Sequence, residues 1–236
     1  MRVRAYDQPV TYGGAVDQLI GWTVVLPVKG LEHAKRRLAP DVGSWRMSLA
    51  AAFAADTLEA TLASADVLRV LVVGGEGIAG STLAQPRVTQ LPDVGDLDAA
   101  VSRGTTWARE QVPHCPILVL QADLPCLRAS DLENLVDAAP ATRPGVLADA
   151  EGLGTVALTL PAGTSLSTAF GAGSFAHHVR AGADPIDVRA PHLRRDVDTL
   201  EHLRDAVRLG VGRATRQVLE RMQFPSAQHL TARWAD

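Results

Sequence analysis

The stretch WTVVLPVKGLEHAKRRL, Trp22–Leu38, joins an apolar run directly to a dense basic cluster. The apolar run, WTVVLPV, predicts a buried β-strand that ends where the basic residues begin. The basic side chains of the cluster are Lys29, His33, Lys35, Arg36 and Arg37. Such a cluster is either a solvated helix start or a binding site for an anion, and other segments of the chain decide between them.

Similar apolar runs recur along the chain and alternate with helical patterns. The predicted strands are Trp22–Val28, Leu68–Val73, Arg87–Leu91, Ile117–Ala122, Val146–Ala148, Thr155–Leu160 and Pro185–Val188. The predicted helices are about Ser44–Ser64 with Ser44 as N-cap, Leu97–Arg109, Ser130–Ala138, and one from Asp198, where DTLE has the form of a capping box. This alternation predicts an α/β fold, with a mostly parallel sheet and helices on both of its faces.

Length and composition indicate one globular domain. The chain has 236 residues, 47% of them hydrophobic and 21% charged, which is enough to bury one sizeable core. We expect a single domain over residues 21–223, an N-terminal extension at 1–20 and a C-terminal tail at 224–236. The formal net charge of −3 argues against a general nucleic-acid binder, so the basic cluster is a local feature.

The sequence predicts neither a membrane protein nor a secreted one. Its N-terminus lacks the apolar segment of a signal peptide, and no apolar span reaches 18 residues. Cys115 and Cys126 form no CxxC motif, which argues against a thiolate metal site and suggests a reducing compartment. We therefore expect a cytoplasmic protein that has no membrane partner.

The glycine-rich segment GEGIAG, Gly75–Gly80, follows a predicted strand and fits the GxGxxG pattern of dinucleotide-binding folds. It also resembles a P-loop, except that Ser81 stands where the phosphate-binding lysine belongs. Only about six residues separate Gly80 from the next predicted strand, whereas a parallel crossover needs about a dozen or more. We therefore interpret the segment as a glycine-rich surface turn.

An aspartate directly follows the apolar strand PILVLQA. In QADLP, Gln121–Pro125, the strand runs into Asp123, and Pro125 then ends it. Ligands of open α/β sheets bind at this carboxyl edge. Asp123 is therefore either a turn or cap aspartate, or a carboxylate that holds Mg²⁺ bridged to substrate phosphates.

A second acidic pair lies in RRDVDT, Arg194–Thr199. If this segment is extended, Asp196 and Asp198 project to the same side. Asp198 has an alternative role as the N-cap of the following helix, whereas Asp196 has no such role. With Arg194 and Arg195 beside them, the two carboxylates suit a metal–phosphate site.

The segment FGAGSFAHH, Phe170–His178, places small residues and Ser174 at the expected start of a short helix. Backbone N–H groups at a helix start bind anions, so the segment is either a phosphate or carboxylate site or a connecting turn. His177 and His178 are adjacent and point apart, which argues against a joint metal site.

Known nucleophile–base signatures such as GxSxG and HExxH do not occur in the sequence. A phosphomonoester needs no general base to act as a nucleophile, because its second pKa is about 6. Nucleotidyl transfer to such a group requires only alignment of the phosphates and neutralisation of their charge by a metal and cationic side chains.

The combination of four segments resembles the guanylyltransferases of coenzyme F420 biosynthesis in order and spacing: WTVVLPVKGLEHAKRRLAP, VLQADLPCL, FGAGSFAHH and LRRDVDTLEHL. The resemblance covers roughly residues 22–210. That family joins GTP to phosphoenolpyruvate or 2-phospho-L-lactate. The resemblance implies a GT-A-like nucleotidyltransferase fold, a three-layer α/β/α sandwich around a mixed sheet, with Mg²⁺ as cofactor.

The resemblance also implies roles for individual residues. Those matching the nucleotide-binding positions are Pro27, Val28, Lys29 and Asp98. Those matching the catalytic positions are Lys29, Lys35, Arg37 and Asp123. Those matching the metal-binding positions are Asp123, Asp196 and Asp198, and those matching the phospho-acid positions are Thr155, Gly171 and Ser174.

One segment departs from the family's pattern. GDLDAA, Gly95–Ala100, stands where the family has Gly-Leu-Asn-Ala-Ala, with Asp98 in place of asparagine and Asp96 inserted. A carboxylate accepts hydrogen bonds but cannot donate one as an amide does, so the contact to the base differs here. Arg36 likewise replaces a usual small hydroxyl residue.

The expected reaction is Mg²⁺-dependent transfer of GMP from GTP to phosphoenolpyruvate or 2-phospholactate, with release of pyrophosphate. Its expected partners are GTP, a phosphorylated three-carbon acid and a downstream F420 ligase, and the sequence permits a homodimer. Two alternatives stay open. A nucleotidyltransferase with a sugar-phosphate or molybdopterin-type acceptor should carry a GGxSxRMG-like loop, which is absent. A non-catalytic nucleotide-binding module has no reason to keep Asp123, Asp196 and Asp198 together.

Overall fold

The structure is a computed structural model that describes residues 21–28, 30, 32, 34–78 and 80–224. The predictions for Lys29, His33, the extension at 1–20 and most of the tail therefore lie outside the described residues. Within the described part of the chain, no helix combines the length and the apolar character needed to cross a membrane.

The described strands form one seven-stranded sheet in the order β3-β2-β1-β4-β6-β5-β7. Their bounds are β1 Trp22–Val28, β2 Val67–Gly74, β3 Val88–Leu91, β4 Ile117–Leu120, β5 Gly145–Ala148, β6 Thr155–Leu160 and β7 Asp184–Pro185. Strand β6 runs antiparallel to both of its neighbours, and the other pairings are parallel. The predicted mostly parallel, mixed sheet is confirmed.

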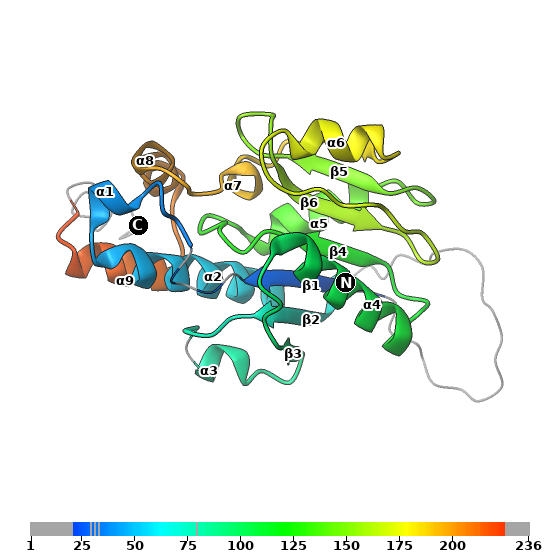
Figure 1. The fold of residues 1–236 in the computed structure, drawn as a ribbon, viewed down its shortest axis with the longest axis horizontal. Helices are drawn as coiled ribbons and strands as arrows, with labels where there is room; N and C mark the ends of the chain where they lie inside the picture. Colours follow the sequence, from blue (N-terminus) through cyan, green and yellow to red (C-terminus); the bar gives the residue numbers. More distant parts are fainter. Residues whose placement is uncertain (1–20, 29, 31, 33, 79, 225–236) are drawn as a thin grey trace.

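Helices cover both faces of the sheet, which confirms the three-layer α/β/α architecture (Figure 1). The helices in the described residues are α1 Ala39–Val42, α2 Trp45–Ala63, α3 Gly80–Leu83, α4 Leu97–Gln111, α5 Ala129–Ala138, α6 Ser174–Arg180, α7 Pro191–Arg194, α8 Leu200–Leu209 and α9 Arg213–Arg221. Helices α2 and α5 pack on one face, while α4 and α6 pack on the other.

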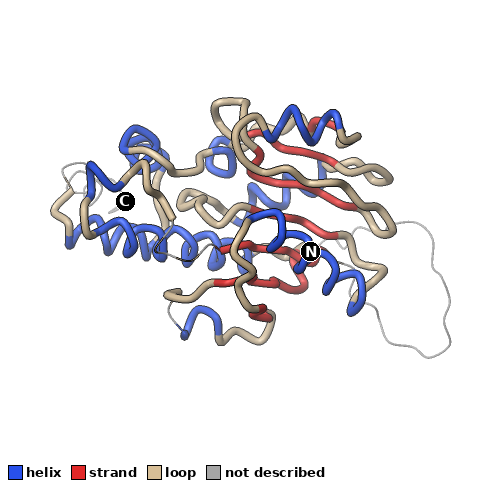
Figure 2. Tube along the Cα trace, viewed as in Figure 1, coloured by secondary structure: helices blue, strands red, loops and turns tan. Residues whose placement is uncertain are grey.

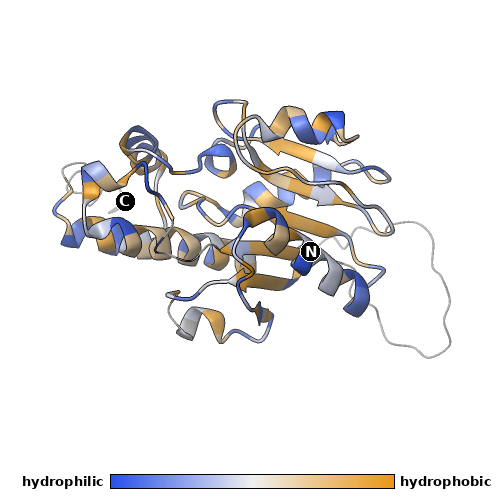
Figure 3. Ribbon diagram, in the orientation of Figure 1, coloured by the Kyte–Doolittle hydropathy of each residue, from blue (hydrophilic) through white to orange (hydrophobic). Residues whose placement is uncertain are grey.

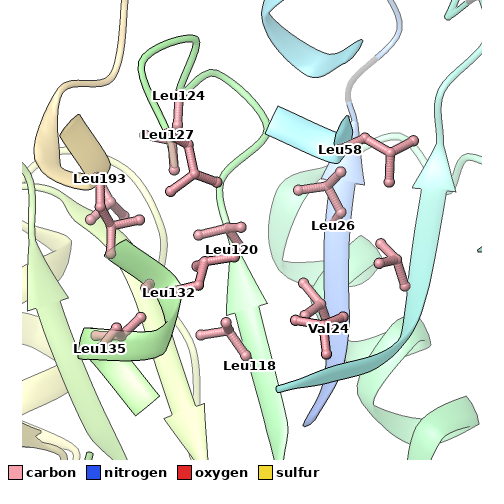
Figure 4. Close-up of a cluster of buried hydrophobic side chains, with 14 of the residues drawn as sticks. Val24, Leu26, Leu58, Leu118, Leu120, Leu124, Leu127, Leu132, Leu135 and Leu193 are labelled. Carbon is pink, nitrogen blue, oxygen red and sulfur yellow. The ribbon is translucent and has the colours of Figure 1, made fainter. Parts of the chain in front are cut away.

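Alternating side chains of the strands build a separate core on each face, as the period of two requires. Val24 and Leu26 of β1 join the cluster beneath α2 and α5, which Figure 4 shows together with Leu118 and Leu120 of β4. Val25 points the other way, toward α4. Each such fully buried side chain stabilises the fold by about 1.5–3 kcal/mol. Figure 3 shows hydrophobic residues concentrated in these strands.

A third cluster contains side chains of α1, the first half of α2, α8 and α9. Figure 2 shows these helices at one end of the molecule, beyond the strands. One buried carboxylate fixes the last helix there. Asp56 of α2 accepts hydrogen bonds from the backbone N–H groups of Ala214 and Thr215, at 2.8 and 2.9 Å. Burial raises the pKa of Asp56, and these N–H donors partly offset that effect. The anion at the start of α9 also complements the helix dipole.

The structure confirms one predicted helix cap in position only and shows that another is wrong. Ser44 occupies the predicted N-cap position of α2, but it has helical dihedral angles and its side chain makes no capping hydrogen bond. Helix α8 is capped by Thr199, whose hydroxyl accepts the N–H of His202, and not by Asp198. Asp198 therefore does not serve as the N-cap of α8, the structural role that was the alternative to metal binding.

The segment after β2 is a turn, as predicted, and does not form a dinucleotide-binding crossover. Gly75 and Gly77 have φ angles of 85° and 100°, a region that favours glycine. The helix that follows, α3, has only four residues. Strand β7 is also displaced from its prediction, covering Asp184–Pro185 in place of Pro185–Val188.

Candidate functional site

A pocket of about 620 Å³ opens at the carboxyl edge of the sheet, beside the ends of β1 and β4. Its volume is in the range of small-molecule sites. Asp123 follows β4 at this edge. Because β6 runs antiparallel to β4, the first residue of β6, Thr155, lies at the same edge. The topology thus brings the predicted metal aspartate and a predicted acid-binding residue into one pocket.

The ammonium group of Lys35 bridges two of the predicted metal ligands. Its Nζ donates to Asp123 Oδ2 and, at 2.7 Å, to Asp198 Oδ1. Burial alone would lower the pKa of Lys35, but the two carboxylates outweigh burial and raise it. Burial alone would raise the pKa of Asp198, and Lys35 outweighs that effect and lowers it. Lys35 is therefore a buried cation, and its segment of the basic cluster is no solvated helix start.

Asp196 and Asp198 face the pocket together, as the extended pattern predicted. The residue between them, Val197, is fully buried in the third core, and its N–H donates to the carbonyl oxygen of Asp123 at 3.2 Å. This bond aligns the acidic segment with the end of β4. Burial and then the neighbouring Asp123 carboxylate raise the pKa of Asp196 to about 7. Among the residues that line the pocket, carboxyl groups thus outnumber lysine and arginine side chains.

Two buried carboxylate oxygens in the described residues have no hydrogen-bond donor. Asp123 Oδ1 and Asp196 Oδ1 are both buried, and neither has a hydrogen-bond partner. An unsatisfied buried carboxylate oxygen is costly, and a bound cation removes that cost. Hard oxygen ligands from one or two carboxylates are what Mg²⁺ takes from proteins. The donor set therefore fits this ion.

A different group of potential metal ligands is more closely spaced than Asp123, Asp196 and Asp198 are. In the part of the chain that is described, ligand atoms of Glu151, Asp196 and His202 all lie within 4.8 Å of one another. Glu151 is exposed and already accepts a hydrogen bond from Arg195 Nη1 at 2.7 Å. All three residues line the pocket, and the pairing with Arg195 already neutralises the charge of Glu151.

The arginines of RRDVDT do not line the pocket, contrary to the prediction of a phosphate-binding role beside the aspartates. Arg194 donates to the carbonyl oxygens of Ala148 and Val188. Arg195 pairs with Glu151. Both side chains thus hold the acidic segment in place from outside.

The acid-binding residues predicted by resemblance do meet in the pocket. Thr155 and Ser174 are buried, and Ser174 Oγ donates to Thr155 Oγ1 at 3.2 Å. Gly171 lines the same wall with a φ of 125°, a conformation that favours glycine. Helix α6 begins at Ser174, as expected from FGAGSFAHH.

Asp98 lies in the first turn of α4, and its carboxylate faces the loop before α6 that carries Phe170 and Gly171. Both of its oxygens accept the N–H of Phe170 at 3.2 Å. Leu97 lines the pocket, whereas Asp98 is absent from its lining. The residue that departs from the family's asparagine therefore fixes the loop that carries Gly171.

Pro27 and Val28 end β1 at the pocket, and Arg37 lies exposed at its rim. Arg37 also contributes to lowering the pKa of Asp198, after Lys35 and His202. Arg36, which stands where the family has a small hydroxyl residue, is exposed and does not line the pocket.

Several residues of the site were not predicted from the sequence. Asp149 accepts the N–H groups of Leu153 and Gly154 and shapes the β5–β6 hairpin at the pocket. His202 reaches the rim from α8. His178 lies behind Thr155, and one signal pointed to it: His178 follows Ser174 by four residues, so the two side chains share a helix face.

Comparisons with known proteins agree with this geometry. A relative from Streptomyces scabiei (strain 87.22), named phosphoenolpyruvate guanylyltransferase, is 41% identical over 212 residues, covering 86% of this chain and 98% of the relative. A solved structure from Desulfovibrio desulfuricans G20, assigned to the nucleotide-diphospho-sugar transferases, has a TM-score of 0.65 at 16% identity, covering 88% of this chain and 97% of that chain. A nucleotidyl transferase from Methanothermobacter has a TM-score of 0.56 at 17% identity, covering 80% of this chain and 97% of that one.

The structural likenesses show the GT-A-like nucleotidyltransferase fold that the resemblance implied. The family described as "Guanylyl transferase CofC like" matches residues 22–233, nearly all of the chain beyond its first 21 residues. The chain belongs to the guanylyl transferase CofC-like family.

Proposed function

We propose that this protein transfers GMP from GTP to phosphoenolpyruvate and releases pyrophosphate. A phosphate oxygen of the acid attacks the α-phosphorus of GTP, and the bond from that phosphorus to the oxygen bridging to the β-phosphate breaks. The electron pair leaves with pyrophosphate. The acceptor's phosphate carries most of its charge at neutral pH, so the reaction needs no side chain to remove a proton.

The observation that carries this proposal is the pair of buried carboxylate oxygens without a donor, on Asp123 and Asp196. These residues would hold Mg²⁺, with Asp198 as a further ligand. When bound, the ion would neutralise charge on the phosphates and polarise the phosphorus–oxygen bonds. The three aspartates line the pocket that also contains the hydroxyl pair.

The pocket has a charged part around the aspartates and an uncharged polar part around Thr155 and Ser174. Lys35 and Arg37 supply positive charge beside the aspartates, where a triphosphate would need it. Lys29, the third predicted cation, lies outside the described residues. Thr155, Gly171 and Ser174 form an uncharged polar wall with one backbone turn, which suits the small acceptor acid. The name of the Streptomyces relative supports phosphoenolpyruvate as that acceptor.

The donor and the acceptor can be tested together. Purified protein with Mg²⁺ is offered each of the four nucleoside triphosphates against phosphoenolpyruvate, 2-phospho-L-lactate and a sugar 1-phosphate, and pyrophosphate release is measured. A downstream F420 ligase traps the guanylylated acid in a parallel set. We expect release with GTP and phosphoenolpyruvate; release only with the sugar phosphate would establish the alternative acceptor class, and release with none would indicate a non-catalytic nucleotide-binding module.

A further inference from the structure

The imidazole of His178 is fully buried beneath the acid-binding wall, and both of its ring nitrogens are engaged. Its Nε2 lies 3.2 Å from the backbone nitrogen of Ala169. Its Nδ1 lies 2.9 Å from Thr155 Oγ1. The edge of the ring also packs against Phe170, with centroids 5.0 Å apart. His178 therefore contacts both the hydroxyl pair and the loop that carries Gly171.

The contact to Ala169 fixes the tautomer of this histidine. A backbone N–H can only donate, so Nε2 must be the unprotonated, accepting nitrogen. A neutral imidazole has a single N–H, which leaves the proton on Nδ1. Burial lowers the pKa of His178, which agrees with a neutral ring. Nδ1–H then donates to the Thr155 hydroxyl.

This tautomer determines how many donors the hydroxyl pair has left. Thr155 and Ser174 own two O–H groups, and one of them is used in the hydrogen bond between them. Because Ser174 donates to Thr155 and His178 Nδ1–H also donates to Thr155, the O–H of Thr155 itself stays available to donate to a ligand. With the opposite tautomer, Nδ1 would accept the Thr155 O–H, and Ser174 would donate to Thr155. No donor would then remain.

We propose that His178 is a positioning residue that turns the Thr155–Ser174 pair into a hydrogen-bond donor for an anionic group of the acceptor acid. The identification of this ligand as the acceptor acid rests on the proposed function. The same ring accepts the Ala169 N–H while Asp98 accepts the next N–H, that of Phe170. One side chain thus orients both the hydroxyls and the glycine loop, without touching the ligand itself.

The tautomer is measurable in the free wild-type protein. A long-range ¹H–¹⁵N spectrum of protein labelled at histidine should show His178 as neutral, with a protonated Nδ1 and an unprotonated Nε2. Assignment comes from the loss of that signal in His178→Gln. A His178 ring protonated at Nε2, or at both nitrogens, overturns the proposal regardless of any substrate.

Two substitutions separate the two nitrogens of the ring. His178→Asn keeps an N–H near the position of Nδ1, whereas His178→Gln keeps a polar atom only near Nε2. We expect His178→Gln to raise KM for phosphoenolpyruvate by about ten- to hundred-fold, as for a lost hydrogen bond to a charged group, with KM for GTP unchanged. His178→Asn should recover part of the loss. Equal increases in both KM values, or no increase for the acid, would contradict the proposal.

The neighbouring histidine provides the matched control. His177 is exposed, bonded to Arg180 and absent from the pocket lining, so His177→Gln should leave both KM values unchanged. Binding of inorganic phosphate, measured by calorimetry, keeps the inference testable if GTP and phosphoenolpyruvate prove not to be the substrates. Wild type and His177→Gln should then bind phosphate more tightly than His178→Gln, and equal affinities would refute the positioning role.

Discussion

Replacing Asp196 with asparagine should stabilise the metal-free protein above pH 7. The pKa of Asp196 rises from 3.8 to about 7 in the folded protein, because the carboxyl is partly buried and lies near Asp123. Between these two values the folded state binds a proton that the unfolded state has lost. The free energy of unfolding therefore falls as pH rises from about 4 to about 7. Asparagine carries no charge and avoids this loss.

The pKa shift sets the size of the effect. A difference of about three pKa units corresponds to about 4 kcal/mol as an upper limit. Asp196 is only half-buried, so solvent screens part of this energy, and we expect a gain of about 2 kcal/mol at pH 8. Near pH 4 the variant and the wild type should differ little.

Urea unfolding in EDTA at pH 4.5 and pH 8 measures this difference. The matched control is Asp198→Asn, two residues away, for which we expect the opposite change in stability at pH 8, a loss in place of a gain. Lys35 lowers the pKa of Asp198 against the effect of burial, so that carboxylate contributes stability above its unfolded pKa, which the control loses at pH 8. Adding Mg²⁺ should stabilise the wild type more than Asp196→Asn. A variant at position 196 that is no more stable than wild type at pH 8 would refute the reasoning.

Three further predictions concern other parts of the chain. Lys35→Met leaves two carboxylates without their shared cation, so thermal melting in EDTA should show that the variant is less stable by about 2 kcal/mol. Mg²⁺ should then stabilise the variant more than it stabilises the wild type. Equal melting of the two proteins in EDTA would exclude the ion pairs of Lys35 with the two aspartates. In Gly104→Ala the new Cβ would lie 2.4 Å from Val25 Cγ1, so urea unfolding should show a loss of about 1–3 kcal/mol, and a neutral result would mean that α4 lies farther from the sheet. Thr199→Ala removes the hydroxyl that accepts the His202 N–H, so urea unfolding should show a loss of about 1 kcal/mol. Unchanged unfolding would mean that Thr199 does not cap α8.

The sheet could be predicted because its strands are nearly continuous apolar runs. Strand β1 occupies the predicted Trp22–Val28, and β2 extends its prediction by one residue at each end. Helix α9 could not be predicted from its own segment. It begins after Gly212 with no side-chain cap of its own, and its first N–H groups bind Asp56, which is 158 positions away from Ala214. A cap supplied by tertiary structure leaves no local signal.

The acidic centre of the site was predictable for the same reason as the sheet. Asp123 follows an apolar strand, and Asp196 and Asp198 flank a buried valine, so their positions follow from strand direction and period. The partners of the basic residues were not predictable in this way. A long side chain such as that of Arg194 or Arg195 can reach in several directions, and only the fold shows which carbonyl or carboxylate it meets.

The most direct test of the account is pyrophosphate release from GTP and phosphoenolpyruvate with Mg²⁺, compared between the wild type and Asp123→Asn. Asp123 contributes a buried oxygen with no donor and a partner for Lys35. We predict release by the wild type and loss of turnover in the variant, with the fold retained by circular dichroism. Turnover retained in Asp123→Asn would contradict the metal site, and a wild type that releases no pyrophosphate would contradict the guanylyl-transfer reaction itself.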